Sequence, residues 1–400
     1  MTSRERVIAA IERTNPDRVP IDLGGTYYSN ILAAPYYQLL KFLKIHKDVK
    51  IADYFQMSVY VDEEVSNRFN TDVIILWPLR DYLGIRRDTA YKEWIMPSGT
   101  PVKVSKDFNL IKNKDGSYIY KKGLQEYRMP KDGFYFDMIN NPYQWVETTK
   151  DVEKIKISPI NGEEKEWLKI QSEKLRRSTD KFIVFDFDGG WVDIANFLIG
   201  TEKFYIDIIS NKRMIHALME KLNEIWKKNI DIIIAATGTN TDCIAMACDL
   251  GSNESGLFKT STIKEMVIPY IKEFYEYVRK VSNYYIFFHT CGSVYQYLPD
   301  LIDAGVNIIN PVQVGAKNME PKKLKNEFGK YVTFWGGSVD PQHVLPHKSR
   351  QIIKEQATYH TEIFQKGGGF IFAPVHNIQP YVPPENIVEL FDTAFKVGKY

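Results

Sequence analysis

The chain is poor in cysteine and has no long apolar run. Only three cysteines occur in 400 residues, which is too few for a disulfide framework and is typical of a reducing compartment. The longest apolar runs, such as residues 232–236, are far shorter than the ~20 residues that span a bilayer. Residues 1–20 carry charges throughout and lack the apolar core of a signal peptide. We therefore expect a cytoplasmic protein that makes no use of a membrane.

The chain also lacks an excess of charge of either sign. Its 52 Lys and Arg residues are interleaved with 50 Asp and Glu residues, for a formal net charge of +2. No basic block interspersed with aromatic residues is present, so the sequence gives no reason to expect a nucleic-acid partner. Hydrophobic residues make up 44% of the chain, which is ample for a large core.

Strand-like apolar runs recur behind helical patterns along the chain. We identify eight of them, at residues 19–23, 72–76, 182–187, 242–248, 285–289, 306–310, 332–335 and 370–373. Helical patterns lie between most of them, for example at residues 203–233, 263–281 and 349–366. This alternation predicts parallel strands joined by crossover helices, and eight repeats at this chain length predict an α/β fold of the (β/α)8 TIM-barrel type.

Residues 81–140 interrupt the alternation. They are rich in Gly, Pro, Tyr and charge, with hairpin signals at Pro97-Ser98-Gly99 and Asp115-Gly116. We expect a small antiparallel β insertion near the mouth of the barrel, within a single domain that spans residues 1–400. The alternative is an ordinary surface insertion with no ligand role.

The fifth apolar run ends abruptly in His289-Thr290-Cys291-Gly292. Residues i and i+2 of a strand point to the same side, so His289 and Cys291 can reach one point and hold a borderline metal such as zinc. His376, after the eighth run, is the natural third ligand, because active sites of such barrels collect at the carboxyl ends of the strands. The alternative is that Cys291 is a buried small hydrophobe and His289 a hydrogen-bonded core residue.

Acidic side chains follow two other predicted strands. Asp249 is expected as a fourth ligand or as a carboxylate that orients an imidazole. Asp186 and Asp188 share a strand face and could act as an acid/base pair or bind substrate, or else cap the next helix. Cys243 and Cys248 are five residues apart, so they face opposite sides of a strand and are expected in the apolar core.

Several short motifs follow a fixed order over nearly the whole chain. They include Arg4-Glu5-Arg6-Val7, Pro16-Asp17-Arg18-Val19-Pro20, His289-x-Cys291-Gly292, Asn310-Pro311-x-Gln313, Trp335-Gly336-Gly337-x-Val339-Asp340 and Gly367-Gly368-Gly369-Phe370. In these motifs and their spacing the chain resembles the uroporphyrinogen decarboxylase superfamily, and specifically its methyltransferase-like branch. The family fold is the (β/α)8 barrel, in agreement with the strand count.

The resemblance implies a metal site. In the methyltransferase branch, zinc held by a His-x-Cys pair and a later Cys binds a thiol, which takes a methyl group from a methyl-corrinoid protein. By position, His289 and Cys291 match the first two ligands, and the third falls at His376, where those enzymes have Cys. A neutral imidazole in place of a thiolate makes the site more positive and a bound thiolate less nucleophilic, so a pterin acceptor is also open.

The expected function is therefore zinc-dependent methyl transfer between methylcobalamin, carried by a corrinoid partner protein, and a small thiol or pterin acceptor. The residues assigned to it are His289, Cys291 and His376 as metal ligands, Asp249, Asp186 and Gln313 as catalytic residues, and Asn310 and Asp188 as cofactor-binding residues.

Two alternatives stay open. One is a decarboxylase of a carboxylated tetrapyrrole, which ranks second because Gly24-Gly25-Thr26-Tyr27-Tyr28 occupies the place of the arginine-rich substrate motif of true decarboxylases. The other is a non-catalytic corrinoid- or tetrapyrrole-binding protein.

Overall fold

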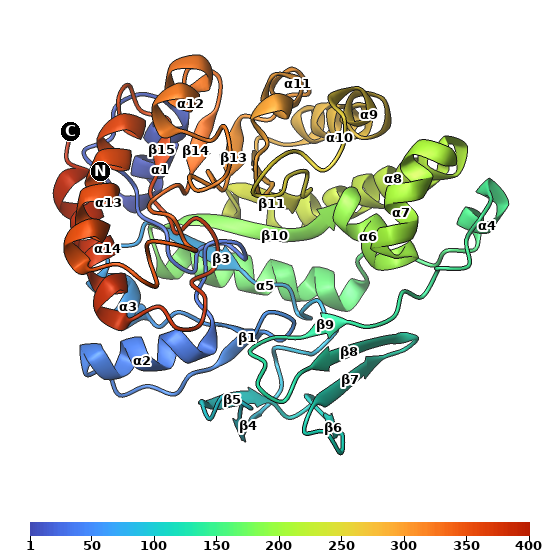
Figure 1. Ribbon diagram of the computed structural model, residues 1–400, viewed down its shortest axis with the longest axis horizontal. Helices are drawn as coiled ribbons and strands as arrows, with labels where there is room; N and C mark the ends of the chain where they lie inside the picture. Colours follow the sequence, from blue (N-terminus) through green and yellow to red (C-terminus); the bar gives the residue numbers. More distant parts are fainter.

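Parallel strands form the centre of the molecule and helices surround them (Figure 1). The computed structural model describes the chain from Met1 to Tyr400, apart from the side chain of Asp188. The barrel strands, in chain order, are β3 (Val73–Leu76), β10 (Phe182–Gly190), β11 (Cys243–Ala247), β12 (Tyr285–His289), β13 (Ile308–Asn310), β14 (Thr333–Trp335) and β15 (Phe370–Ile371). Each strand pairs in parallel with the next one along the chain.

Residues 19–23 close this sheet into a barrel. On one side, Ile21 forms a parallel bridge with Phe372, just beyond β15, and the Phe372 N–H donates to the Pro20 carbonyl at 2.8 Å. On the other side, the N–H of Asp72, just before β3, donates to the Ile21 carbonyl at 2.7 Å. The segment thus takes the place of an eighth strand, which confirms the predicted (β/α)8 barrel.

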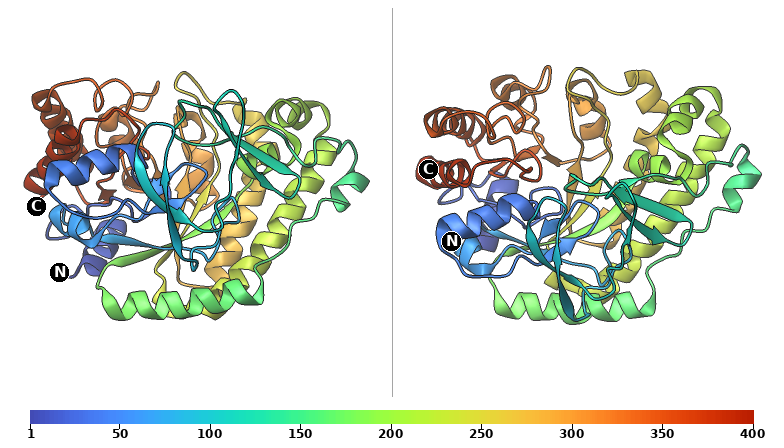
Figure 2. Two further views of the ribbon diagram at one scale, coloured as in Figure 1. Left: turned by 90° about the horizontal axis from the view of Figure 1, so that it is seen from below. Right: turned by 60° about the horizontal axis from the view of Figure 1, so that its bottom comes forward.

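The helices cover the outside of the barrel (Figures 1 and 2). They are α1 (Ser3–Glu12), α2 (Ala33–Leu43), α3 (Glu63–Arg68), α4 (Thr149–Glu153), α5 (Gly162–Ser178), α6 (Val192–Ile199), α7 (Thr201–Ser210), α8 (Lys212–Thr237), α9 (Thr260–Met266), α10 (Ile268–Val281), α11 (Leu298–Asp303), α12 (Pro321–Phe328), α13 (Arg350–Phe364) and α14 (Pro384–Val397), with short 3-10 turns η1 (Gly238–Asn240) and η2 (Tyr295–Tyr297). In the described part of the chain, none of these helices is both long and apolar enough to cross a membrane.

Two of the predicted helices are each divided in the structure. The pattern at residues 203–233 covers α7 and α8, which are separated at Asn211, and the pattern at 263–281 covers α9 and α10. A proline in the first turn of α10 explains the second break, because proline has no N–H and therefore begins a helix more easily than it continues one.

The predicted antiparallel insertion is confirmed. β4 (Tyr91–Ile95) pairs with β5 (Pro101–Ser105) around the predicted turn at Gly99, and β6 (Ile111–Lys112), β7 (Tyr118–Lys122), β8 (Gln125–Met129) and β9 (Asp137–Met138) form a second antiparallel sheet. Both sheets lie along the bottom of Figure 1, near β1 (Ile51–Asp53), which itself pairs with β2 (Ser58–Val59).

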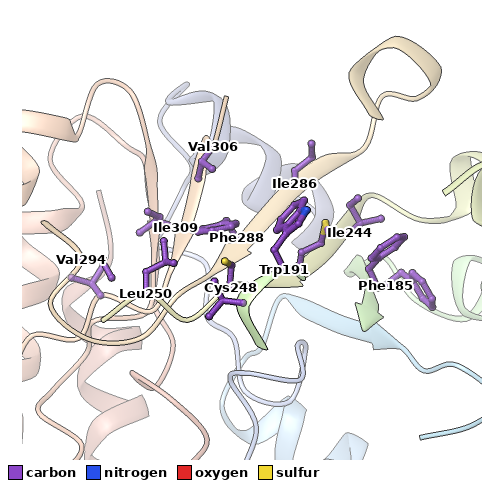
Figure 3. Close-up of a cluster of buried hydrophobic side chains, with 14 of the residues drawn as sticks. Phe185, Trp191, Ile244, Cys248, Leu250, Ile286, Phe288, Val294, Val306 and Ile309 are labelled. Atoms are coloured by element: carbon purple, nitrogen blue, oxygen red, sulfur yellow. The ribbon is translucent and has the colours of Figure 1, made fainter. Parts of the chain in front are cut away.

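Alternate residues of the barrel strands belong to two separate apolar clusters. Ile286 and Phe288 of β12 join the larger cluster, part of which Figure 3 shows together with Cys248. Phe287, between them, joins a smaller cluster that includes Trp335 and Cys243. Cys243 and Cys248 are both fully buried, which confirms their expected place in the core. Two residues on from Phe287, the strand period places His289 on the face of the smaller cluster.

A buried carboxylate joins the closing segment to the rest of the barrel. Asp72 is 0% exposed and accepts hydrogen bonds from Arg6 at 2.7 Å, from Arg18 at 2.7 and 2.9 Å, and from the Ile21 N–H at 2.8 Å. Both Asp72 oxygens are therefore fully used. α1, residues 19–23 and β3 meet at this one side chain.

Removal of this carboxylate should destabilise the whole barrel. We expect Asp72→Ala to lower the free energy of unfolding by about 3–5 kcal/mol, because two guanidinium groups would be left without their buried partner. Asp392→Ala removes the exposed pair with Arg68 and should cost less than about 1 kcal/mol. Urea unfolding of both variants measures the difference, and equal losses would contradict a central role for Asp72.

Candidate metal centre and cavity

The turn after β12 presents Cys291 beside the end of the strand. Three hydrogen bonds fix this turn: the Thr290 N–H donates to the Asn310 carbonyl at 2.7 Å, the Cys291 N–H to Asp249 Oδ1 at 2.9 Å, and the Gly292 N–H to Gln313 Oε1 at 2.8 Å. Neighbouring strand ends therefore hold the backbone on both sides of the Cys291 thiol.

His289, Cys291 and His376 come together at this rim of the barrel. One possible ligand atom from each residue lies within 4.8 Å of the other two. The Cys291 Sγ is 3.3 Å from His289 Nε2, and the ring centroids of His289 and His376 are 5.4 Å apart. Ligand atoms of a tetrahedral zinc ion are separated by roughly 3.3–3.8 Å, so a small closing movement of these side chains would suit the ion. One sulfur and two imidazole nitrogens are a donor set that zinc prefers.

Asn310 determines which nitrogen of His289 is available. Its Nδ2 donates to the Trp335 carbonyl at 2.9 Å, which leaves its Oδ1 to pair with His289 Nδ1 at 2.7 Å. An amide oxygen only accepts, so Nδ1 carries the ring proton and the lone pair of Nε2 points towards Cys291. The Tyr28 ring stacks on one face of the His289 imidazole, and the two ring centroids are 4.0 Å apart.

His376 is held differently. Its Nδ1 accepts a hydrogen bond from the N–H of Asn377 at 2.8 Å. The ring proton of the neutral form is therefore on Nε2. A metal ion bound at Nε2 would move that proton to Nδ1, and the Asn377 N–H would then need another acceptor. A metal ligand at His376 thus requires a local change that His289 does not.

Burial keeps both imidazoles neutral. It lowers the pKa of His289 to about 4, and burial together with the neighbouring His289 lowers the pKa of His376 to about 4. The pKa of the Cys291 thiol is raised well above its usual value, first by burial and then by Asp249 and Asp193. The neutral His289 ring offers the Nε2 lone pair to a cation, whereas His376 must first release the Asn377 N–H or move its ring proton, and the thiol needs the cation itself to lose its proton.

Two carboxyl groups lie next to each other beside the donors. Asp249 Oδ1 is 3.7 Å from His289 Nε2, and the Asp249 N–H donates to Asp193 Oδ2 at 2.9 Å. Burial raises the pKa of Asp249, and burial together with Asp249 raises the pKa of Asp193 to about 7. Across the described residues, no lysine or arginine forms an ion pair with either group. The two carboxyl groups therefore hold their protons more tightly than usual, and a bound cation would favour their ionised forms.

A cavity of about 140 Å³ opens beside His289 and His376. Its aromatic lining consists of Tyr27, Tyr28, Phe55, Tyr82 and Phe197, and its acidic lining of Asp186, Asp193 and Asp249. Among the described residues that line it, none is a lysine or an arginine. The volume holds roughly five water molecules or one small ligand.

The other predicted residues have varied places. Asp186 lines the cavity. Gln313 lies behind the turn. Its Nε2 donates to Asn253 Oδ1 at 2.5 Å, and its Oε1 accepts a hydrogen bond from the Gly292 N–H. Asn310, which we assigned to cofactor binding, is fully buried behind His289, with both amide atoms occupied. The side chain of Asp188 lies outside the described residues.

Sequence reasoning missed Asp193 and Tyr28 as members of the site. Asp193 is in the first turn of α6, where an acidic residue is common because it stabilises the helix terminus, so its position carried no distinct signal. Tyr28 was considered only as part of a segment without arginine. Its contact with His289 depends on closure of the barrel, which the local sequence does not encode.

The fold and these donors define a barrel protein with a candidate cation site at the carboxyl ends of its strands. Residues 139–397 match the family described as uroporphyrinogen decarboxylase (URO-D), so the chain belongs to the uroporphyrinogen decarboxylase family. This confirms the resemblance found in the sequence. No curated protein sequence matches the chain.

Among the solved structures that are similar to this one are two enzymes. A methyltransferase from Methanosarcina mazei has a TM-score of 0.60 and 18% identity, and the match covers 99% of each chain. A B12-independent methionine synthase from Shewanella sp. W3-18-1, solved in complex with selenomethionine, has a TM-score of 0.43 and 8% identity over 95% of this chain and 97% of its own. At 18% identity, the first likeness supports the barrel fold.

Gly292 allows the turn to pass close to a neighbouring loop. Its φ is +85°, and a Cβ atom there would lie 2.4 Å from the Gly251 carbonyl carbon. Gly99, in the β4–β5 turn, has a similar φ of +80° but open space around its Cβ position.

We therefore expect the two glycines to respond differently to substitution by alanine. Gly99→Ala should cost about 1–2 kcal/mol of unfolding free energy for its left-handed backbone. Gly292→Ala should cost about 1–3 kcal/mol more, because two backbone segments must separate. Denaturant unfolding measures both values. Equal costs would mean that the close approach to Gly251 has no energetic weight.

Proposed function

We propose that this protein is a zinc-dependent methyltransferase, which moves a methyl group between a methyl-corrinoid carried by a partner protein and a thiol or pterin acceptor. The observation that supports it most is the convergence of His289, Cys291 and His376 beside a cavity at the carboxyl ends of the barrel strands. Catalytic zinc sites use three protein ligands of these types and keep one position open for a substrate.

The chain supplies the metal ligands and the groups that orient them. Bound zinc would supply Lewis acidity, which lowers the pKa of an acceptor thiol. His289 offers Nε2 because Asn310 holds its Nδ1–H. Cys291 offers its sulfur from a turn that Asp249 and Gln313 fix through backbone N–H groups. His376 completes the set once the Asn377 N–H has found another acceptor.

The carboxyl groups and the amide have separate roles in this proposal. Asp249 lies 3.7 Å from His289 Nε2 and is the group placed to take the proton that an acceptor thiol loses. Asp186 positions the substrate from the wall of the cavity. Gln313 acts indirectly, as a positioning residue, because its amide is engaged with the turn rather than with the cavity.

The methyl group would come from outside the chain. The net reaction would form an S–CH3 bond from a sulfur lone pair. The Co–CH3 bond of the partner's corrinoid would break with both electrons kept by cobalt, from Co(III) to Co(I), and the thiol proton would be released. The cavity lies at the rim of the barrel, the face on which barrel enzymes meet their substrates, and a corrinoid partner would have to dock there.

The cavity lining argues against the decarboxylase alternative. A carboxylated tetrapyrrole carries many negative charges, which proteins bind with arginine and lysine. In the described lining of this cavity, acidic and aromatic side chains take their place, and Tyr27 and Tyr28 belong to the segment that replaces the arginine-rich motif. A volume of about 140 Å³ is also small compared with the roughly 300–1,000 Å³ of pockets for larger organic ligands.

Metal content and methyl transfer test this proposal together. We expect the purified protein to hold one zinc per chain and to demethylate methylcobalamin in the presence of a thiol. His289→Ala and Cys291→Ala should lose most of the zinc and at least about a thousandfold in rate, because each removes a ligand. His343→Ala, which changes an exposed histidine, is the matched control and should keep both. A zinc-free native protein, or release of CO2 from uroporphyrinogen without metal, would refute the proposal.

The role assigned to Asn310 has its own test. Asn310→Asp keeps an oxygen for the His289 Nδ1–H, whereas Asn310→Leu has a similar size but no acceptor. Both variants lose the bond to Trp335, so their difference isolates the hydrogen bond to the imidazole. We expect a roughly 10–100-fold lower zinc affinity for the leucine variant than for the aspartate variant, measured by competition with a chelator. Equal affinities would exclude an orienting role for Asn310.

A further inference from the structure

An aromatic cluster forms part of the cavity wall. Phe55, Tyr82 and Phe197 contact one another there. The ring centroid of Tyr82 is 5.2 Å from that of Phe55 and 5.2 Å from that of Phe197. The two phenylalanine rings are perpendicular, with centroids 6.1 Å apart. Tyr127 of the inserted strand β8 packs behind them, 6.0 Å from Phe55 and 6.3 Å from Tyr82. Phe55, Tyr82 and Phe197 thus come from three separate segments, and the insertion supports two of them through Tyr127.

The charged groups of the cavity are all acidic in its described lining. Asp193 and Asp249 are held next to each other by the Asp249 N–H, and Asp186 contributes a third carboxyl. A zinc ion with the Cys291 thiolate carries one net positive charge, which a single carboxylate is enough to balance. The remaining carboxyls face a cavity without lysine or arginine in the described residues, so a cation bound there would stabilise their ionised forms, whereas an anion would find no cationic partner.

We propose that the molecule bound beside the metal is a small thiol that carries a positively charged ammonium group, held by the aromatic cluster and by Asp193. This inference rests on the proposed function and names the substrate class of the same site. The sulfur would face the metal donors, and the ammonium group would face Phe55, Phe197 and Tyr82, whose negative π-faces attract cations. Lys122 Nζ already lies 5.6 Å from the Tyr82 ring centroid, so the Tyr82 ring is known to accept a cation and would have to take the ligand on its cavity side. A thiol with a sulfonate or carboxylate tail would bring its charge against Asp193 and Asp249.

Three thiols with the same two-carbon spacer separate charge from shape. Thiocholine carries a quaternary ammonium group that cannot itself ligate zinc. In 3,3-dimethylbutane-1-thiol, a carbon atom replaces the nitrogen, so the shape is retained and the charge is lost. In 2-mercaptoethanesulfonate the tail is negative. Titration calorimetry on the zinc-loaded protein measures the affinity of each thiol directly, without turnover.

We expect thiocholine to bind at least about tenfold more tightly than its carbon isostere, and the sulfonate to bind most weakly. The isostere is the more apolar of the two, so apolar burial alone would give the opposite order. Asp193→Asn should reduce the preference of about tenfold for thiocholine to about threefold or less. Tyr82→Leu should reduce it as well. Asp303→Asn, an exposed substitution of the same chemical type, should leave the preference unchanged.

Each outcome distinguishes this inference from the function on which it rests. If the isostere or the sulfonate binds as tightly as thiocholine to a protein that contains zinc, the charge preference is refuted and the methyltransferase proposal stands. If no thiol binds while methyl transfer to another acceptor proceeds, the charge preference is likewise refuted and the methyltransferase proposal stands. If the preference is unchanged in Asp193→Asn and in Tyr82→Leu, the assigned residues are wrong. A protein that takes up no zinc overturns the proposed function itself.

Discussion

Closure of the barrel is the constraint on which the site depends. The candidate metal donors come from the ends of β12 and β15, which are separated by β13 and β14 around the ring, and they meet because the sheet curls round. Residues 19–23 complete that ring, and the buried Asp72 holds them against β3 through two arginines. The same closing segment leads directly to Tyr28, whose ring covers His289. The ion-pair network thus holds the start of the segment whose continuation, at Tyr28, stacks on the His289 ring.

Much of the fold could be predicted from the sequence because barrel strands are buried on both faces. The resulting apolar runs mark all the barrel strands, and turn chemistry at Gly99 and Gly116 marks the hairpins of the insertion. The division of the long helical pattern at Asn211 could not be predicted, because the apolar period continues across it. Nor could the contact of Tyr127 with the cavity wall, which joins residues distant in sequence.

The candidate site divides in the same way. The convergence of His289, Cys291 and His376 follows from the strand period and from the position of active sites in barrels, both of which can be applied to a sequence. The role of Asn310 does not, because it depends on the direction of one amide between His289 and the Trp335 carbonyl of the next strand. Residue types at strand ends can be predicted as a group, whereas their division into ligands and supports requires side-chain geometry.

The charge of the cavity connects the metal to its substrate. A family that includes enzymes for polyanionic tetrapyrroles needs cationic side chains for that purpose, but here aromatic and acidic groups occupy the described lining. Two neighbouring carboxylates repel each other unless a cation lies close to them, although the Asp249 side chain is 42% exposed. Zinc at the three donors would stabilise the ionised form of Asp249 most, because Asp249 Oδ1 lies 3.7 Å from His289 Nε2. Asp193 contacts Asp249 rather than the donors. In the proposed function, the metal ion would lie beside Asp249 and the positively charged group of the ligand would lie beside Asp193.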